Sequence, residues 1–188
     1  MNDNSVRDWL VGFALAALMA LTRSGHFSSA MGLPDASLAA FMLAGCCLPA
    51  WGFPLLLIEA AGIDLLATTV GGVSGWCITP AYPFLAAAYA VAWWAGRWYG
   101  RRHAPAWRGL LPFAAAAVGA TLAAFAISNA GFYLFAGYFE AMSAAEYALR
   151  VANYLPGYLQ GTLLWLGLAV ALYVLLALTA ARPARANG

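Results

Sequence analysis

Long apolar stretches follow one another along this chain with only short polar connections between them, and this pattern constrains its fold more than any other feature. A helix needs about 20 apolar residues to cross a lipid bilayer, and some cross with about 17. We therefore predict six spanning helices, over residues 6–23, 35–49, 51–68, 80–99, 108–128 and 158–181. Only 9% of the residues are charged, against roughly 25% in soluble domains. We expect an all-α membrane protein, with residues 1–188 forming a single transmembrane domain in the lipid bilayer.

The first apolar run, Trp9 to Leu21, also has features of a signal peptide, because a possible cleavage site follows it at Ser28-Ser29-Ala30. The single arginine before the run is flanked by two aspartates, which makes a weak positively charged region. We expect the run to be retained as a helix, since the predicted topology requires it.

Arginine placement predicts how the helices are oriented, because cytoplasmic loops carry an excess of basic residues. With both termini in the cytoplasm, seven of the nine basic residues lie inside, namely Arg7, Arg97, Arg101, Arg102, Arg108, Arg182 and Arg185. Arg23 and Arg150 then lie outside. The net charge of +2, with no basic cluster of interleaved aromatics, argues against nucleic acid as a partner.

The outer connection from Gly71 to Pro83, GGVSGWCITPAYP, is the most distinctive segment of the chain. Its glycines allow a ligand to approach the backbone closely. We predict that Thr79 and Pro80 cap and begin the next helix, which places Cys77 just outside a helix N-terminus. The helix dipole favours a thiolate there, and a thiolate is a soft ligand for a transition metal. The alternative is that Cys77 is a small buried hydrophobic residue.

Other candidate groups lie within the helices or just after them. Cys46 and Cys47 are adjacent, so they predict no disulfide framework, and we interpret them as packing residues. Acids inside a membrane are costly and by default functional. We expect Asp64 to reach an outer pocket. Glu59, near the middle of the same helix, has no obvious partner in the sequence, and its alternative to a functional role is a hydrogen bond to a neighbouring helix. His26 follows the first helix, where it is either a ligand-site residue or a solvated surface group.

The third outer connection, residues 129–157, is long enough to suggest a function or its own structure. Ser143 and Glu146 form a capping box, and Glu146 with Arg150 makes an i,i+4 pair. We predict a short helix at about 144–155 that lies over the outer mouth as a lid. The alternative is an interfacial helix that takes no part in binding.

Small residues recur every four positions on the first helix, at Gly12, Ala16 and Ala20. In lipid, such residues let another helix approach closely. We expect either a docking face for a partner membrane protein or close packing inside the bundle.

Enzyme functions are less favoured by the sequence. Gly72-Val73-Ser74-Gly75 matches the GxSG motif of rhomboid intramembrane proteases, which need a later histidine to activate the serine. The only later histidine, His103, lies in the predicted inner loop. An intramembrane enzyme using Ser74 therefore remains the weaker alternative.

Six helices, an outer lid, an outer pocket and a small-residue face on the first helix together resemble an S-component, the substrate-binding membrane subunit of energy-coupling-factor (ECF) vitamin transporters. More narrowly, the chain resembles the solitary cobalamin-binding S-components of the BtuM family. The residues that carry this resemblance are Gly25-His26-Phe27, Asp64, Gly75-Trp76-Cys77, Tyr82 and Arg150.

The resemblance implies that Cys77 is the axial ligand of cobalt in bound cobalamin, with the nucleotide base displaced, and that the site can remove cyanide from cyanocobalamin. It further implies corrinoid contacts for His26, Asp64, Trp76, Tyr82, Arg150 and Asn153. It places the chain in a bacterial cytoplasmic (inner) membrane as a multi-pass protein. A partner, an ECF energising module made of a transmembrane coupling subunit and ATPases, would dock on the first helix. The chain itself has no phosphate-binding loop.

A corrin ring is wide, flat and fringed with amides, so its site requires aromatic walls and a few polar groups. We expect several aromatic residues near the outer mouth: Trp76, Tyr82, Phe84, Phe132, Tyr133, Tyr154 and Tyr158. The alternative function is an S-component for a different vitamin, in which Cys77 has only a structural role.

Overall fold

The computed structural model describes residues 3–23, 33–72, 74–103 and 106–180, leaving out the side chains of Asp3, Cys77 and Ala180. Within these ranges the chain forms seven α-helices and no strand, which confirms the predicted all-α class. The helices are α1 (Asp3–Arg23), α2 (Ser37–Cys47), α3 (Gly52–Thr69), α4 (Pro83–Arg102), α5 (Leu110–Phe135), α6 (Ala144–Ala152) and α7 (Leu155–Ala180). Two 3₁₀ turns, η2 (Gly75–Cys77) and η3 (Trp107–Gly109), precede α4 and α5.

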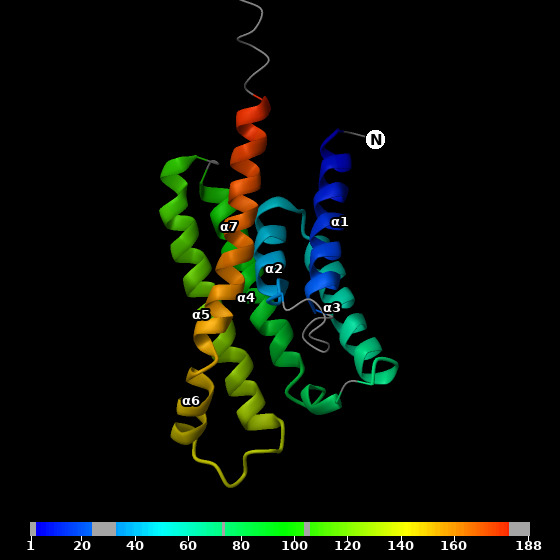
Figure 1. The fold of residues 1–188 in the computed structure, drawn as a ribbon, viewed down its shortest axis with the longest axis vertical. Helices are drawn as coiled ribbons and strands as arrows, with labels where there is room; N and C mark the ends of the chain where they lie inside the picture. Colours follow the sequence, from blue (N-terminus) through cyan, green and yellow to red (C-terminus); the bar gives the residue numbers. More distant parts are fainter. Residues whose placement is uncertain (1–2, 24–32, 73, 104–105, 181–188) are drawn as a thin grey trace, which may run out of the picture.

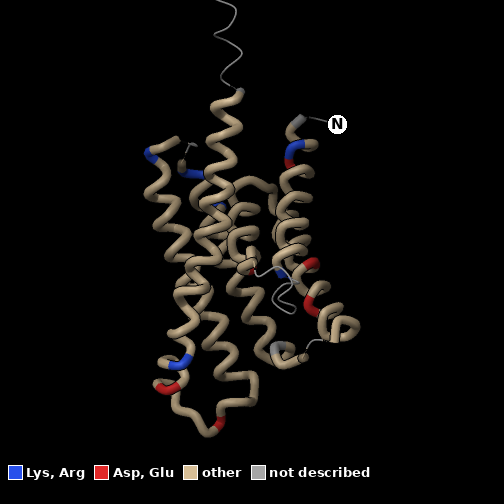
Figure 2. The backbone as a smooth tube through the Cα atoms, viewed as in Figure 1, with Lys and Arg blue, Asp and Glu red and all other residues tan. Residues whose placement is uncertain are grey.

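Four segments of the described chain are long and apolar enough to cross a membrane: Asn4–Arg23, Gly52–Thr69, Trp107–Phe135 and Leu155–Thr179. The beginning of α1 and the end of α7 lie at the same end of the molecule (Figure 1). Basic residues gather mainly toward that end (Figure 2). A multi-pass arrangement in which the described chain begins and ends on one side therefore fits the fold, as the arginine pattern predicted.

The second predicted span is corrected by the structure. Helix α2 has only 11 residues, so it is about 16 Å long, roughly half the thickness of a bilayer core. It contacts α1, α3, α4 and α7, and eight of its residues are buried, namely Ser37, Leu38, Ala39, Ala40, Phe41, Met42, Ala44 and Gly45. A helix that is apolar on every face is stable in this position because its neighbours surround it.

Glycines allow α2 and α4 to pack with their backbones in contact. A Cβ atom on Gly45 or on Gly96 would overlap the backbone of the opposite helix. The Cys46 thiol donates a hydrogen bond to the Gly96 carbonyl over 3.2 Å, so the packing interpretation of Cys46 is confirmed. Cys47 is exposed, and for that residue the packing interpretation was wrong.

Between α1 and α3 runs a groove of about 190 Å³, lined in part by Gly12, Ala16 and Glu59. The Trp51 ring covers Gly12, because a Cβ atom there would lie 3.3 Å from it. Internal packing therefore accounts for Gly12, whereas Ala20 is exposed on the predicted docking face.

Candidate functional site

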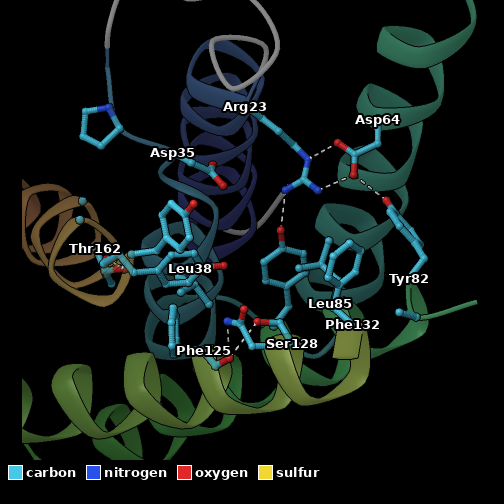
Figure 3. A pocket seen from close by; sticks show the side chains of 18 of the residues that line it. Arg23, Asp35, Leu38, Asp64, Tyr82, Leu85, Phe125, Ser128, Phe132 and Thr162 are labelled. Atoms are coloured by element: carbon cyan, nitrogen blue, oxygen red, sulfur yellow. Dashed lines mark hydrogen bonds and ion pairs between the residues drawn. The ribbon is translucent and has the colours of Figure 1, made fainter. Parts of the chain in front are cut away.

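A cavity of about 680 Å³ opens between α1, α3, α4, α5, α7 and the N-terminal end of α2 (Figure 3). Aromatic side chains supply much of its wall: Trp76, Tyr82, Tyr89, Phe125, Phe132, Tyr154 and Tyr158. Its polar lining consists mainly of Arg23, Asp35, Asp64, Ser128, Asn129 and Thr162. Five of the seven aromatic residues expected near the outer mouth line this cavity, whereas Phe84 and Tyr133 are not among its lining residues. Its volume lies within the usual range of about 300–1,000 Å³ for ligand sites.

An ion pair between Arg23 and Asp64 forms one side of the cavity. Both residues are only 5% exposed. The Arg23 Nε donates to Asp64 Oδ1 over 2.7 Å, and an Arg23 terminal nitrogen donates to Oδ2. The other terminal nitrogen donates to Ser37 Oγ over 2.9 Å and to the Tyr89 hydroxyl. Arg23 thus joins α1 to α2, α3 and α4 at a single point. These partners compensate the cost of burying its charge.

Asp64 lines the cavity, as the sequence predicted, but the carboxylate is already engaged by protein groups. Besides its two bonds to Arg23, it accepts a hydrogen bond from the Tyr82 hydroxyl over 2.7 Å. Burial first, and then this hydrogen bond, raise the pKa of Tyr82 to about 12. The phenol therefore keeps its proton at neutral pH, and it links the segment before α4 to the ion pair.

Helix α4 begins later than predicted, and this corrects the argument made for Cys77. Its first residue is Pro83, not Pro80, because the Tyr82 amide donates to the Thr79 carbonyl over 2.9 Å and closes a separate turn. Cys77 ends η2 before that turn, and its sulfur lies outside the described atoms. A helix dipole acts mainly within the first turn, so the dipole of α4 does not account for a thiolate at this position.

Trp76, next to Cys77, places η2 at the cavity. Its side chain lines the cavity and stacks on Tyr138, with ring centroids 3.7 Å apart and ring planes inclined by 7°. The Tyr138 hydroxyl donates to the Trp76 carbonyl over 3.4 Å. The Cys77 segment is therefore attached to the connection between α5 and α6. Ser74 Oγ accepts a hydrogen bond from the Trp76 amide, which is a capping contact rather than one expected of a nucleophile.

The short outer helix is present as α6, with the predicted capping box. Ser143 Oγ accepts from the Glu146 amide, and the Glu146 carboxylate accepts from the Ser143 amide. Hydrogen bonds from Ser143 hold the pKa of the Glu146 carboxyl below its ordinary value. Tyr147 attaches α6 to α5 by donating to Asn129 Oδ1 over 3.4 Å. No residue of α6 is among those that line the cavity, so α6 lies beside the cavity and does not cover it.

The remaining predicted site residues fall outside the cavity or outside the described ranges. Arg150 and Asn153 are exposed, are not among the lining residues, and contact each other through the Arg150 carbonyl. His26 lies outside the described residues. His103 follows α4, and its ring stacks on Tyr99, with centroids 4.9 Å apart.

Arg23 and Asp35 are cavity residues that the sequence analysis did not single out. Arg23 could have been suspected because it is one of two arginines on the predicted outer side, but this position alone is a weak sign of a role in the cavity. Together the lining groups suit a large, partly flat ligand with polar substituents, because aromatic faces alternate with hydrogen-bonding groups. No protein-family model matches this sequence, and no curated protein matches it at a significant level. The chemistry of the cavity is therefore the basis for assigning a function to this protein.

Proposed function

We propose that this chain is a membrane-embedded cobalamin-binding and uptake protein of the S-component type. Its site would be the cavity described above, facing the outside of a bacterial cytoplasmic membrane. The observation that carries the proposal is the position of Trp76: it lines the cavity and directly precedes Cys77 in η2. A corrin bound in the cavity would therefore lie close to the Cys77 backbone.

The lining fits the chemistry of a corrinoid. The ring has broad apolar faces, and the cavity offers aromatic surfaces from several helices and connections, including Tyr82 and Tyr158. The ring edge carries amides, and the lining supplies polar partners such as Ser128 and Asn129. Aromatic walls with a small number of placed polar groups are typical of sites for large cofactors.

Cys77 would bind the cobalt of the transported cobalamin. Its thiolate donates an electron pair to the metal and displaces the nucleotide base of the vitamin. Donation from sulfur weakens the bond on the opposite face of the ring. Cyanide then leaves as the anion with the bonding electron pair, so this step needs no oxidant or reductant. The bound cobalamin supplies this chemistry. The protein contributes the axial ligand of the cobalt, which tunes its reactivity.

The experiment is an absorption spectrum of the protein purified from cells supplied with cyanocobalamin. We expect a pink to red protein with a spectrum distinct from that of free cyanocobalamin. The C77A variant should lose that distinct spectrum. The matched control is C47A, because Cys47 is exposed and ends α2, whose opposite end lines the cavity.

Two results would contradict the proposal. If C77A retained the spectrum of the unmodified protein, sulfur would not bind the cobalt. If the purified protein were colourless and bound no corrinoid, the alternative of a different vitamin would be preferred, with Cys77 as a structural residue.

Uptake would require either facilitated movement or an energising partner that docks on α1. Ala20 gives the cleaner test of docking, since it is exposed. Leucine at Gly12 would instead meet the Trp51 ring and disturb internal packing. We expect A20L to reduce cobalamin uptake by cells without changing the absorption spectrum of the purified protein. Undiminished uptake by A20L would argue against docking on this face.

A further inference from the structure

We infer that Asp35 gives the cavity its ligand selectivity, by accepting a hydrogen bond from an N–H donor on the ligand and by repelling ligand carboxylates. This assignment rests on the proposed function, because it names the group that distinguishes among corrinoids. Asp35 lies at the cavity wall, just before α2, and Figure 3 shows its side chain on the same side of the cavity as Arg23.

The charges around the cavity do not balance. The described lining residues include three charged groups: Arg23, Asp35 and Asp64. Arg23 and Asp64 neutralise each other through their ion pair. Asp35 forms no ion pair among the described residues, so the lining retains one negative charge. A cavity with a mostly apolar wall strengthens the electrostatic effect of such a charge on its ligand.

The two oxygens of the Asp35 carboxylate differ in their hydrogen-bond partners. Oδ1 accepts from the Ser37 amide over 2.9 Å and from the Ser37 hydroxyl over 2.6 Å. The hydroxyl of Ser37 in turn accepts from Arg23, which directs its proton toward Asp35. None of the hydrogen bonds formed within the described chain uses Oδ2. This oxygen is the acceptor that we assign to the ligand, since a carboxylate can accept several hydrogen bonds.

The backbone on both sides of Asp35 is held by hydrogen bonds to other helices. The residue before it, Pro34, accepts a hydrogen bond at its carbonyl from Trp165 Nε1 over 2.8 Å. The residue after it, Ala36, donates its amide to Thr22 Oγ1 over 3.1 Å. The backbone at Asp35 is thus attached to both α7 and α1. A carboxylate fixed in this way loses little freedom when a ligand binds, and therefore discriminates well between ligands.

The same geometry sets the chemical class of the ligand. A primary amide or an ammonium group can donate to Oδ2, whereas a carboxylate at that place would meet a like charge. The peripheral side chains of cobalamin end in primary amides, which are suitable donors. A corrinoid whose side-chain amides have been hydrolysed to carboxylates should be rejected.

The test measures the binding of both corrinoids to the purified full-length protein by quenching of tryptophan fluorescence. Unmodified protein should bind cobalamin at least about tenfold more tightly than the carboxylate form. D35N keeps an oxygen for the Ser37 bonds but replaces the free acceptor with an N–H donor. We expect D35N to weaken cobalamin binding by about tenfold to a hundredfold, the usual effect of losing a hydrogen bond to a charged group. The preference for the amide form should disappear.

D35E retains the negative charge and should therefore retain the preference for the amide form. D8N is a matched control, because Asp8 pairs with Arg7 on the surface, away from the cavity. An unchanged preference in D35N would overturn the assignment of Asp35 and leave the proposed function intact. Equal binding of both corrinoids to the unmodified protein would also overturn the assignment, even if D35N failed to fold. Absence of binding by either corrinoid would overturn the proposed function and this assignment together.

Discussion

The Arg23–Asp64 ion pair gives the sharpest test of how this bundle is held together. D64N preserves the shape of the side chain but removes its charge, so the guanidinium of Arg23 stays buried without a counter-charge. Removing one partner of a buried pair costs about 3–5 kcal/mol. Arg23 and Asp64 are each only 5% exposed, so they form a buried ion pair to which this cost applies. We therefore expect D64N to lose about 3–5 kcal/mol of unfolding free energy.

Replacing both partners should cost much less. In R23M/D64L no unpaired charge remains, and exchanging a buried ion pair for apolar residues is often neutral or stabilising. Ser37, Tyr82 and Tyr89 each lose a hydrogen-bond partner, at about 1 kcal/mol per bond. We expect the double variant to lie within about 3 kcal/mol of the unmodified protein, well below the sum of the two single changes, so that these changes are strongly non-additive.

Unfolding free energies can be measured by adding sodium dodecyl sulfate to protein in a non-ionic detergent and following far-ultraviolet circular dichroism. The control is D8N, which breaks the Arg7–Asp8 pair on the surface, where such pairs contribute about 0–1 kcal/mol. The reasoning would be refuted if D64N cost no more than D8N. It would also be refuted if the double variant lost as much as the sum of its two single changes.

Three further predictions concern other parts of the fold. G96L should lower the thermal unfolding midpoint, measured by tryptophan fluorescence, because a side chain there overlaps the backbone of α2; an unchanged midpoint would contradict the close packing of α2 and α4. E146A should destabilise α6 at neutral pH, because the carboxylate form, whose pKa is lowered in the folded state, bonds Ser143. This stabilisation is complete above the ordinary carboxyl pKa and is lost as the pH falls through the lowered value, so the difference in hydrogen exchange of α6 between the two proteins should vanish in acid; a difference that persists would exclude the cap as its cause. Under the proposed function, Y138A, which removes the ring stacked on Trp76, should accelerate corrinoid dissociation more than a Y173A control on α7 does; equal dissociation rates in stopped-flow fluorescence would show that the stack does not hold the Cys77 segment in place.

Local patterns in the sequence were enough to predict the helical class, four of the six expected apolar spans and the cap of α6. Hydropathy and capping depend on residues close together in the chain, so they can be seen without knowing the fold. The same applies to the expectation that Asp64, Trp76 and Tyr82 lie near one pocket, because each lies toward the predicted outer side of the membrane. All three line the cavity.

Only the tertiary structure decided what these groups contact. The partner of Asp64 is Arg23, 41 positions away, and no local pattern connects the two. Likewise the sequence could not show that α2 stops after 11 residues, or that Asp35 before it faces the cavity with Oδ1 engaged by Ser37. The physical reason is that a charge buried in an apolar bundle takes its partner from whichever helix lies beside it, and which helices lie side by side is settled by packing over the whole chain.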